Sequence, residues 1–446
     1  DALQERRFLA RLPAGGRATC DGRVRELGEP GLRELWLHLT NRCNMSCRHC
    51  LFASSPADRA ELATGVALLR VDQAAELGCR VFALTGGEPF QHPGFRDIVE
   101  AILARSRAHA VVLTNGSFLR QHEEDLARWD PERFHVQVSL DGLPERHDAL
   151  RGRGAYEELA DQLQVLRRRG FPFTVSMCVD VDNVEDMPAL VTRAHQLGAS
   201  NVHFLWLFVR GRAGQERYVE PRRIAARLRE ASAEGQRLGL EIDNLEALKT
   251  QVFAPPGTLH DGTTAGWESA AIGPDDRLYP SAATVGMSEL ATDPQGELAD
   301  AWRDGDVLRR LRSATAAELE SPLRFLTGGG DSDHSTAFGG TWIGDDPYLP
   351  LYEELVLWLV AREAGPVAED APRLRLKMGD VLESCGAHGA VALVHSNCLL
   401  ATAQADSRTA VKEFYRDAAE NTRDDILNPV CYAEDMIAHI PEDYRF

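Results

Sequence analysis

The chain has 446 residues, of which 44% are hydrophobic and 26% are charged, and these proportions exclude a wholly disordered protein. Its formal net charge of −19 disfavours nucleic acid as a partner, because an acidic surface repels phosphate groups. No uncharged apolar run reaches the ~18 residues of a membrane helix, and the polar amino-terminal residues lack a signal-peptide core, so we expect a cytoplasmic protein with no membrane partner.

A repeating pattern of short apolar runs and longer amphipathic stretches begins at Leu35. The apolar runs, rich in β-branched and aromatic residues, predict six buried parallel strands at 35–40, 81–85, 110–114, 135–140, 173–179 and 202–208. The stretches between them predict helices at 58–78, 94–106, 118–129, 155–170 and 184–197. No Gly-x-Gly-x-x-Gly follows the first strand, so we predict an α/β fold with a partial (β/α)6 TIM-like barrel rather than a Rossmann sheet. Its chemistry is expected at the carboxyl ends of the strands.

The pattern changes after residue 212. A helix is predicted near 220–238, the stretch 255–345 is rich in loops, and a further amphipathic helix is predicted over 350–364. Residues 365–373 indicate a linker before a tail that begins with a strand-like run. We therefore divide the chain into an N-terminal segment (1–34), the barrel (35–215), an α+β C-terminal extension (216–345) and a C-terminal region (346–446).

The nine cysteines are sparse for a disulfide scaffold and favour a reducing compartment, where clustered cysteines are more often metal ligands. Cys43, Cys47 and Cys50 form a C-x3-C-x2-C triplet directly after the first predicted strand. Thiolates this close on one loop cannot bridge one another without strain, but they can bind one soft metal centre. A [4Fe–4S] cluster held by three cysteines keeps one iron open to a non-protein ligand. The alternative is a structural zinc loop with a distant fourth ligand.

The triplet resembles the signature of the radical S-adenosylmethionine (SAM) superfamily, and further motifs in the family's order extend the resemblance over roughly residues 30–212. These motifs follow successive predicted strands and comprise Gly86-Gly87-Glu88-Pro89, Thr114-Asn115-Gly116, Ser139-Leu140-Asp141-Gly142 and, slightly later, Arg151. The resemblance implies that the first motif receives the SAM amino group, that Ser139 and Asp141 hold the ribose, and that Arg151 binds the carboxylate. We count Asn115 among the SAM contacts.

The resemblance also implies the cofactors and the reaction. A [4Fe–4S] cluster binds SAM, a flavodoxin- or ferredoxin-type reductant supplies an electron, and a 5′-deoxyadenosyl radical then abstracts hydrogen from a substrate. The family often has an aromatic residue before the last cysteine, whereas this chain has His49 there. That departure changes the packing near the cluster but removes no ligand.

Residues 257–340 resemble the SPASM or twitch extension of such enzymes, yet no cysteine lies between 179 and 384. Thr264, Ser281, Ser321 and Thr327 stand where cysteines are expected, and hydroxyls are poor iron–sulfur ligands. We therefore expect a substrate-binding cap without auxiliary clusters. Within it, Asp331, Asp333 and His334 beside three glycines indicate either substrate binding and acid–base catalysis or only a capped polar turn.

The tail contains two Cys/His pairs around a strand-like run, namely Cys385 with His388 and His395 with Cys398. They predict a second metal site, and the alternative is that they are free side chains in a small core. Cys431 could complete that site or bind a thiophilic substrate, whereas Cys20, Cys79 and Cys178 are expected to be structural. Residues 408–446 weakly resemble the lead-in helices of arsenite-type methyltransferases, which predicts a fused methyltransferase if the coding sequence continues.

Three functions follow from these observations. The first is a radical SAM enzyme that modifies a peptide or a small natural product. The second is a radical SAM enzyme of arsenic- or selenium-type metabolism, suggested by the tail cysteines. The third is a non-catalytic iron–sulfur or zinc scaffold, which would have no use for the SAM-binding motifs.

Overall fold

The computed structural model describes residues 29–253, 260–362, 375–377 and 392–394. Every helix and strand in these ranges belongs to one compact unit. No helix within the described ranges is long and apolar enough to span a bilayer. Cys20, Cys385, His388, His395, Cys398 and Cys431 lie outside the described residues, so the second metal site predicted in the tail stays a prediction.

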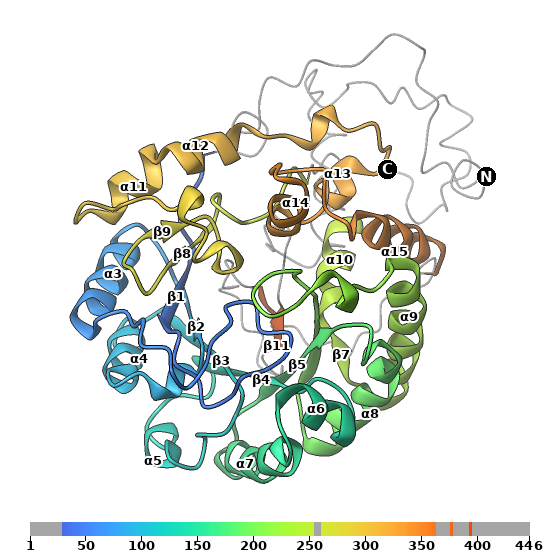
Figure 1. Cartoon of the computed structure of the whole chain (residues 1–446), viewed down its shortest axis with the longest axis horizontal. Coiled ribbons are helices and arrows are strands. Elements are labelled where there is room, and N and C mark those ends of the chain that lie inside the picture. Colours follow the sequence, from blue (N-terminus) through green and yellow to red (C-terminus); the bar gives the residue numbers. More distant parts are fainter. Residues whose placement is uncertain (1–28, 254–259, 363–374, 378–391, 395–446) are drawn as a thin grey trace, which may run out of the picture. The chain divides into compact units, whose positions relative to one another are not determined.

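A curved sheet forms the centre of the fold (Figure 1). Its strands are β1 (Glu34–Thr40), β2 (Val81–Gly86), β3 (His109–Thr114), β4 (Phe134–Ser139), β5 (Phe173–Val179), β6 (Asn201–Trp206), β7 (Glu241–Ile242), β8 (Ser269–Ile272) and β9 (Leu278–Tyr279). The strand order is β7-β6-β5-β4-β3-β2-β1-β8-β9, and only the β8–β9 pair is antiparallel. The six predicted strands are therefore confirmed, and they pair in parallel in sequence order.

Helices cover the outer face of this sheet (Figure 1). Around the outside lie α3 (Thr64–Glu76), α4 (Phe95–Leu103), α5 (Glu123–Leu126), α7 (Ala155–Arg169), α8 (Met187–Leu197) and α9 (Pro221–Leu238). The remaining helices are α6 (Pro144–Arg151), α10 (Asp243–Val252), α11 (Leu298–Asp304), α12 (Asp306–Ser313), α13 (Arg324–Thr327), α14 (Ser332–Gly339) and α15 (Leu349–Arg362). Separately, β10 (Arg375–Lys377) and β11 (Ala392–Val394) pair in parallel.

The strands are buried along nearly their whole length, as predicted, but the two faces of the sheet differ in polarity. In β4, Phe134, Val136 and Val138 pack into the main apolar core beneath the helices. His135 and Gln137, between them, are equally buried but belong to the opposite face of the sheet. The inner side of the barrel is therefore partly polar, which suits a ligand cavity better than a closed apolar core.

Two helix predictions were too long and one region was under-predicted. The helix expected from residue 58 begins at Thr64, because residues 60–62 run extended beside β1, where Leu62 N donates to Leu39 O at 2.9 Å. The helix expected over 118–129 shortens to α5. The loop-rich stretch 255–345 contributes β8 and β9 to the sheet and also contains α11 to α14. Arg70 of α3 anchors the β8–β9 turn by two 2.8 Å hydrogen bonds to Asp276.

Glu34, at the start of β1, is a buried acid whose titration opposes folding. Burial raises the pKa of Glu34 to about 8, and the charge of Glu268 raises it further, against a hydrogen bond with Trp36. The folded state therefore holds a proton that the unfolded state has released above pH 4.5, so stability falls as pH rises from 4.5 to about 8. Between these pH values the wild type should lose on the order of 2–4 kcal/mol of unfolding free energy relative to Glu34→Gln.

Chemical denaturation of both proteins at pH 5 and pH 8 measures this difference. Glu124→Gln, an exposed change on α5, serves as the control and should leave the pH dependence unaltered. Parallel pH profiles for wild type and Glu34→Gln would contradict the prediction.

Candidate active site

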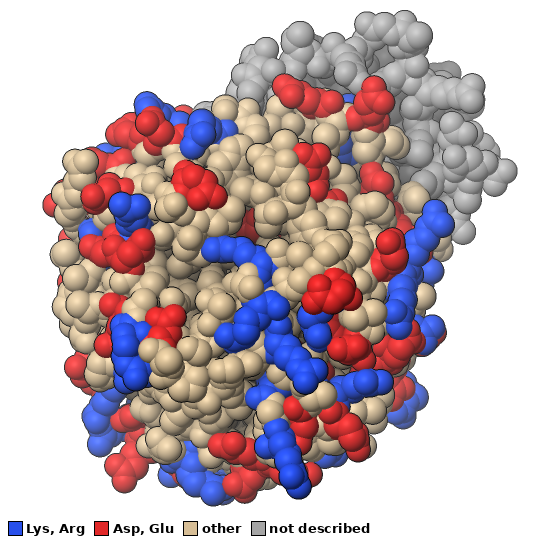
Figure 2. Space-filling view, viewed as in Figure 1, with Lys and Arg blue, Asp and Glu red and all other residues tan. Residues whose placement is uncertain are grey.

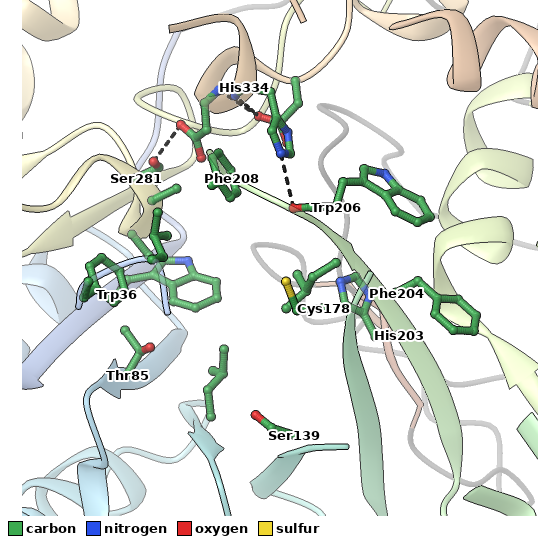
Figure 3. Close-up of a pocket in the computed structure, with 18 of the residues that line it drawn as sticks. Trp36, Thr85, Ser139, Cys178, His203, Phe204, Trp206, Phe208, Ser281 and His334 are labelled. Carbon is green, nitrogen blue, oxygen red and sulfur yellow. Dashed lines mark hydrogen bonds and ion pairs between the residues drawn. The ribbon is translucent and has the colours of Figure 1, made fainter. Parts of the chain in front are cut away.

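A cavity of about 380 Å³ opens at the carboxyl ends of the strands (Figure 3). Its lining includes three groups of residues. The loop after β1 contributes Cys43, Cys47, His49 and Cys50. The strand ends contribute Gly86, Gly87, Asn115, Ser139, Cys178 and Trp206. The extension contributes Thr264, Ser281, Thr327, Asp331, Asp333 and His334. Sequence positions far apart thus meet in one cavity, and Cys178, which we expected to be only structural, is among them.

The three cysteines of the loop all line this cavity. Cys43 and Cys47 are buried and Cys50 is half-buried. Among the described residues, no three His, Cys, Asp or Glu side chains converge closely enough to hold a single metal ion. An iron–sulfur cluster does not require three side chains to converge on one metal ion, because each cysteine binds a different iron. Three thiols around a shared cavity are therefore a donor set that fits an iron–sulfur cluster.

Burial favours the protonated form of the Cys43 and Cys47 thiols until a metal replaces the proton. Burial raises the pKa of Cys43 to about 12, partly offset by the amide of Met45, and burial also raises the pKa of Cys47. Metal binding must deprotonate a thiol, so loading of this loop should release protons.

Arg212, after β6, holds the cysteine loop in place. Its Nε donates to Cys47 O at 2.7 Å, its Nη2 to Ser54 O at 2.8 Å, and its backbone N to Cys50 O at 3.0 Å. A Cβ on the preceding Gly211 would lie 2.3 Å from Cys50 O, so only glycine allows this approach. Sequence reasoning missed this pair, whose signal is a Gly-Arg dipeptide just after the sixth strand.

Gly86 and Gly87 bring the end of β2 against the start of the same loop. Gly87 N donates to Thr40 O at 2.6 Å, and a Cβ on Gly87 would lie 2.3 Å from Arg42 O. Gly86 has φ of +129°, and its Cβ would lie 2.4 Å from Thr40 O. Both positions therefore require glycine.

Glu88 lies behind the cavity wall and organises the next strand end. Its carboxylate accepts hydrogen bonds from Thr114 Oγ1 at 2.8 Å, Asn115 N at 2.9 Å and Phe90 N at 3.2 Å. Burial raises the pKa of Glu88 to about 7, although these hydrogen bonds lower it. Asn115 Nδ2 in turn donates to Asn44 Oδ1 at 2.8 Å and lies 3.7 Å from Cys43 Sγ. Glu88 thus couples the third strand end to the cysteine loop.

Asp141 and Arg151 form a buried ion pair beside the loop. Arg151 Nε lies 2.5 Å from Asp141 Oδ2, and its Nη1 lies 3.9 Å from Cys47 Sγ. Asp141 also accepts from Cys178 N at 2.8 Å and lies 3.2 Å from His49 Nε2. Burial would raise the pKa of Asp141, but Arg151 and His49 outweigh it and hold that pKa well below its usual range. Asp141 is therefore ionised, and His49 takes part in this network.

The extension forms the opposite wall of the cavity. Asp331 caps α14 by accepting from Asp333 N at 2.7 Å, as the polar-turn interpretation predicted. Asp333 accepts from Ser281 Oγ at 2.7 Å, and the His334 ring stacks on Phe208 with centroids 3.9 Å apart (Figure 3). Burial, and then the charge of Asp331, raise the pKa of Asp333 to about 7. Asp333 can therefore exchange a proton near neutral pH.

Three of the four hydroxyl residues that replace the expected cysteines line the cavity. These are Thr264, Ser281 and Thr327. The fourth, Ser321, instead hydrogen-bonds to Glu353 of α15 and is not among the lining residues. The hydroxyls therefore present a polar surface rather than one common metal site.

Comparison with known proteins supplies the family. Residues 37–194 match the family model of the radical SAM superfamily. The chain is 28% identical to the antilisterial bacteriocin subtilosin biosynthesis protein AlbA of Bacillus subtilis, over 55% of this chain and 53% of AlbA. It is 35% identical to the AdoMet-dependent heme synthase of Methanosarcina barkeri, over 41% of this chain and 53% of that protein. It is 28% identical to the PqqA peptide cyclase of Ruegeria pomeroyi, over 65% and 79%. The chain thus spans about half the length of the first two relatives.

Solved structures share the fold. The anSMEcpe structure with bound AdoMet aligns with a TM-score of 0.62 at 15% identity, covering 75% of this chain and 94% of that one. Streptococcus suis SuiB bound to its precursor peptide SuiA aligns with a TM-score of 0.54 at 15% identity, covering 64% and 67%. The predicted partial barrel is thereby confirmed. The family match and these relatives together identify residues 37–194 as a radical SAM domain and support an enzyme.

Proposed function

We propose that this enzyme cleaves SAM reductively at a [4Fe–4S] cluster held by Cys43, Cys47 and Cys50 and modifies a peptide or a small natural product. The observation that carries the proposal is that the three cysteines of one loop and the ends of five strands, β2 to β6, line a single cavity. Family membership itself implies the cluster and SAM.

When bound, the cluster and SAM together supply a 5′-deoxyadenosyl radical that abstracts hydrogen. This chain's residues bind and orient. Gly86, Gly87, Asn115, Ser139 and Arg151, which line the cavity, would contact SAM. Glu88, Pro89 and Asp141 are buried behind them and would hold them in position. Arg151 offers its cationic guanidinium to a carboxylate, while Asp141 keeps that side chain fixed.

A peptide is the substrate class that the relatives support. AlbA is named for subtilosin biosynthesis, PqqA peptide cyclase for its peptide, and SuiB for its precursor peptide SuiA. The extension would act as the substrate-facing cap. There, Asp333 and His334 would exchange protons with the substrate, and Asp331 would fix both by capping α14.

An acidic flavodoxin- or ferredoxin-type reductant fits the face above the barrel. Lys and Arg side chains gather around the hollow at the centre of the face in Figure 2, despite the net charge of −19. Arg48, on the cysteine loop, is exposed. Cations beside the cluster loop would steer an anionic partner there.

The test uses the full chain, reconstituted anaerobically, reduced and incubated with SAM. We expect 5′-deoxyadenosine to form and about four iron atoms to bind per chain. About eight iron atoms would instead indicate a second cluster, for which the tail cysteines are the candidates. A cluster-loaded, reduced sample that forms no 5′-deoxyadenosine would overturn the proposal and leave the scaffold interpretation. Neighbouring arsenic-resistance genes would favour arsenic-type metabolism over a peptide substrate.

A further inference from the structure

The residues that line the cavity also include one face of α10, which packs beside β6. Asn244, Ala247, Leu248 and Gln251 of α10 recur at helical spacing and all line it. Phe204 of β6 lies on the side of the cavity away from Thr85 and Ser281 (Figure 3). We call this part, lined by the four α10 residues, Phe204, and Tyr352 and Leu355 of α15, the α10 lobe.

Gln251 is the exceptional member of the α10 lobe. Gln251 is only 3% exposed. Neither its amide nitrogen nor its amide oxygen has a hydrogen-bond partner in the described part of the chain. Burying an amide without partners costs roughly 1–3 kcal/mol, so proteins rarely retain one without use. Gln251 is among the residues that line the cavity, and a ligand bound in the α10 lobe can supply both a donor and an acceptor.

Asn244, two turns earlier on the same face, shows what a carboxamide does in this place. Its Oδ1 accepts from Phe204 N at 2.8 Å, and its Nδ2 donates to Phe204 O at 2.8 Å. β7 pairs only with Asn201 and Val202 of β6, so Asn244 takes the place of the missing strand. A side-chain amide of α10 thus already binds the backbone N–H and C=O of one residue through its two hydrogen bonds.

We propose that the α10 lobe binds a backbone amide segment of the substrate, with Gln251 donating to its carbonyl and accepting from its N–H. This assignment rests on the peptide substrate proposed above and locates part of its binding site. An uncharged amide matches the lobe, because Ala247, Leu248 and Leu355 around Gln251 are apolar and offer no counterion. Substrate side chains next to the bound amide would pack against them.

The probe is N-acetyl-leucine N-methylamide, which carries two peptide groups and needs no knowledge of the natural substrate. Saturation-transfer NMR and titration with the full, cluster-loaded chain measure its binding. We expect millimolar affinity for the wild type and about tenfold weaker binding to Gln251→Leu, which removes two hydrogen bonds. N-acetyl-leucine methyl ester lacks one N–H. The wild type should bind this ester more weakly than the amide, whereas Gln251→Leu should bind the ester and the amide equally weakly.

Gln121→Leu, an exposed change outside the cavity, is the matched control and should bind like the wild type. Gln251→Leu should also leave the thermal midpoint unchanged or raised, because an apolar side chain of similar size replaces an unpartnered amide. A midpoint lowered by several degrees would mean that Gln251 has a structural role and would overturn the assignment. So would no binding to the wild type, or equal binding to Gln251→Leu.

The proposed function is tested separately by SAM cleavage, which Gln251→Leu should retain. Absence of 5′-deoxyadenosine in the wild type would remove the enzymatic proposal. Binding of the probe would still report on the α10 lobe, because it does not depend on the cluster.

Discussion

Replacing Cys47 by alanine is expected to eliminate SAM cleavage and to lower bound iron from about four atoms per chain to below about one. Cys47 is the middle ligand of the proposed three and is buried beside Arg151. Its loss would leave two thiols for a site that needs three, and a neutral methyl group cannot replace a thiolate. Iron analysis, the visible absorption of the cluster and 5′-deoxyadenosine formation measure the effect.

Cys79→Ala is the matched control. Cys79 is also buried, but its Sγ lies 3.3 Å from Val81 O at the start of β2, and it does not line the cavity. This variant should keep its iron and its SAM cleavage. Retention of both by Cys47→Ala would show that the ligand assignment is wrong.

Replacing Arg151 by methionine is expected to destabilise the protein by about 3–5 kcal/mol, because it leaves the charge of Asp141 buried and unpaired. The Asp141 side chain is fully buried and that of Arg151 is 10% exposed, so solvent screens the pair little. His49 and His147 would remain near Asp141, and a histidine is a cation only when protonated. Chemical denaturation measures the loss, and weaker SAM binding should accompany it.

Two further variants separate charge burial from general damage. Asp141→Asn combined with Arg151→Met should recover much of the lost stability, since no uncompensated charge stays buried. Arg153→Met, two residues further along and exposed, should change the unfolding free energy by less than about 0.5 kcal/mol. Equal effects of Arg151→Met and Arg153→Met would contradict the argument.

The barrel could be predicted because its signals are local. Each strand is a short apolar run, and the ends of the first four strands carry motifs that need no knowledge of distant residues. Asp331 illustrates the limit, since the sequence allowed both a cap and a chemical role. In the structure it caps α14 and also lines the cavity. One carboxylate can do both, so the two interpretations did not exclude each other.

The missed features depend on contacts between distant residues. Arg212 was overlooked because its three hydrogen bonds go to backbone of the cysteine loop, which no side-chain pattern reveals. Asn244 looks like an ordinary residue of a helix, yet it pairs with the edge of β6. β8 was missed because Ser269–Ile272 is short and rich in small residues, so its apolar signal is weak.

The pairing of β8 with β1 has a consequence for how the protein can be shortened. Residues 34–37 of β1 register with 269–272, so both sides of the first barrel strand are occupied. A truncated protein that ends at residue 252 would lack β8. It would expose unpaired backbone N–H and C=O groups along one edge of β1, which is an apolar strand. Because an unpaired strand edge can pair with another chain, the truncated barrel should precipitate or form oligomers. The extension thus completes the sheet of the barrel through β8, and the barrel should not remain monomeric without it.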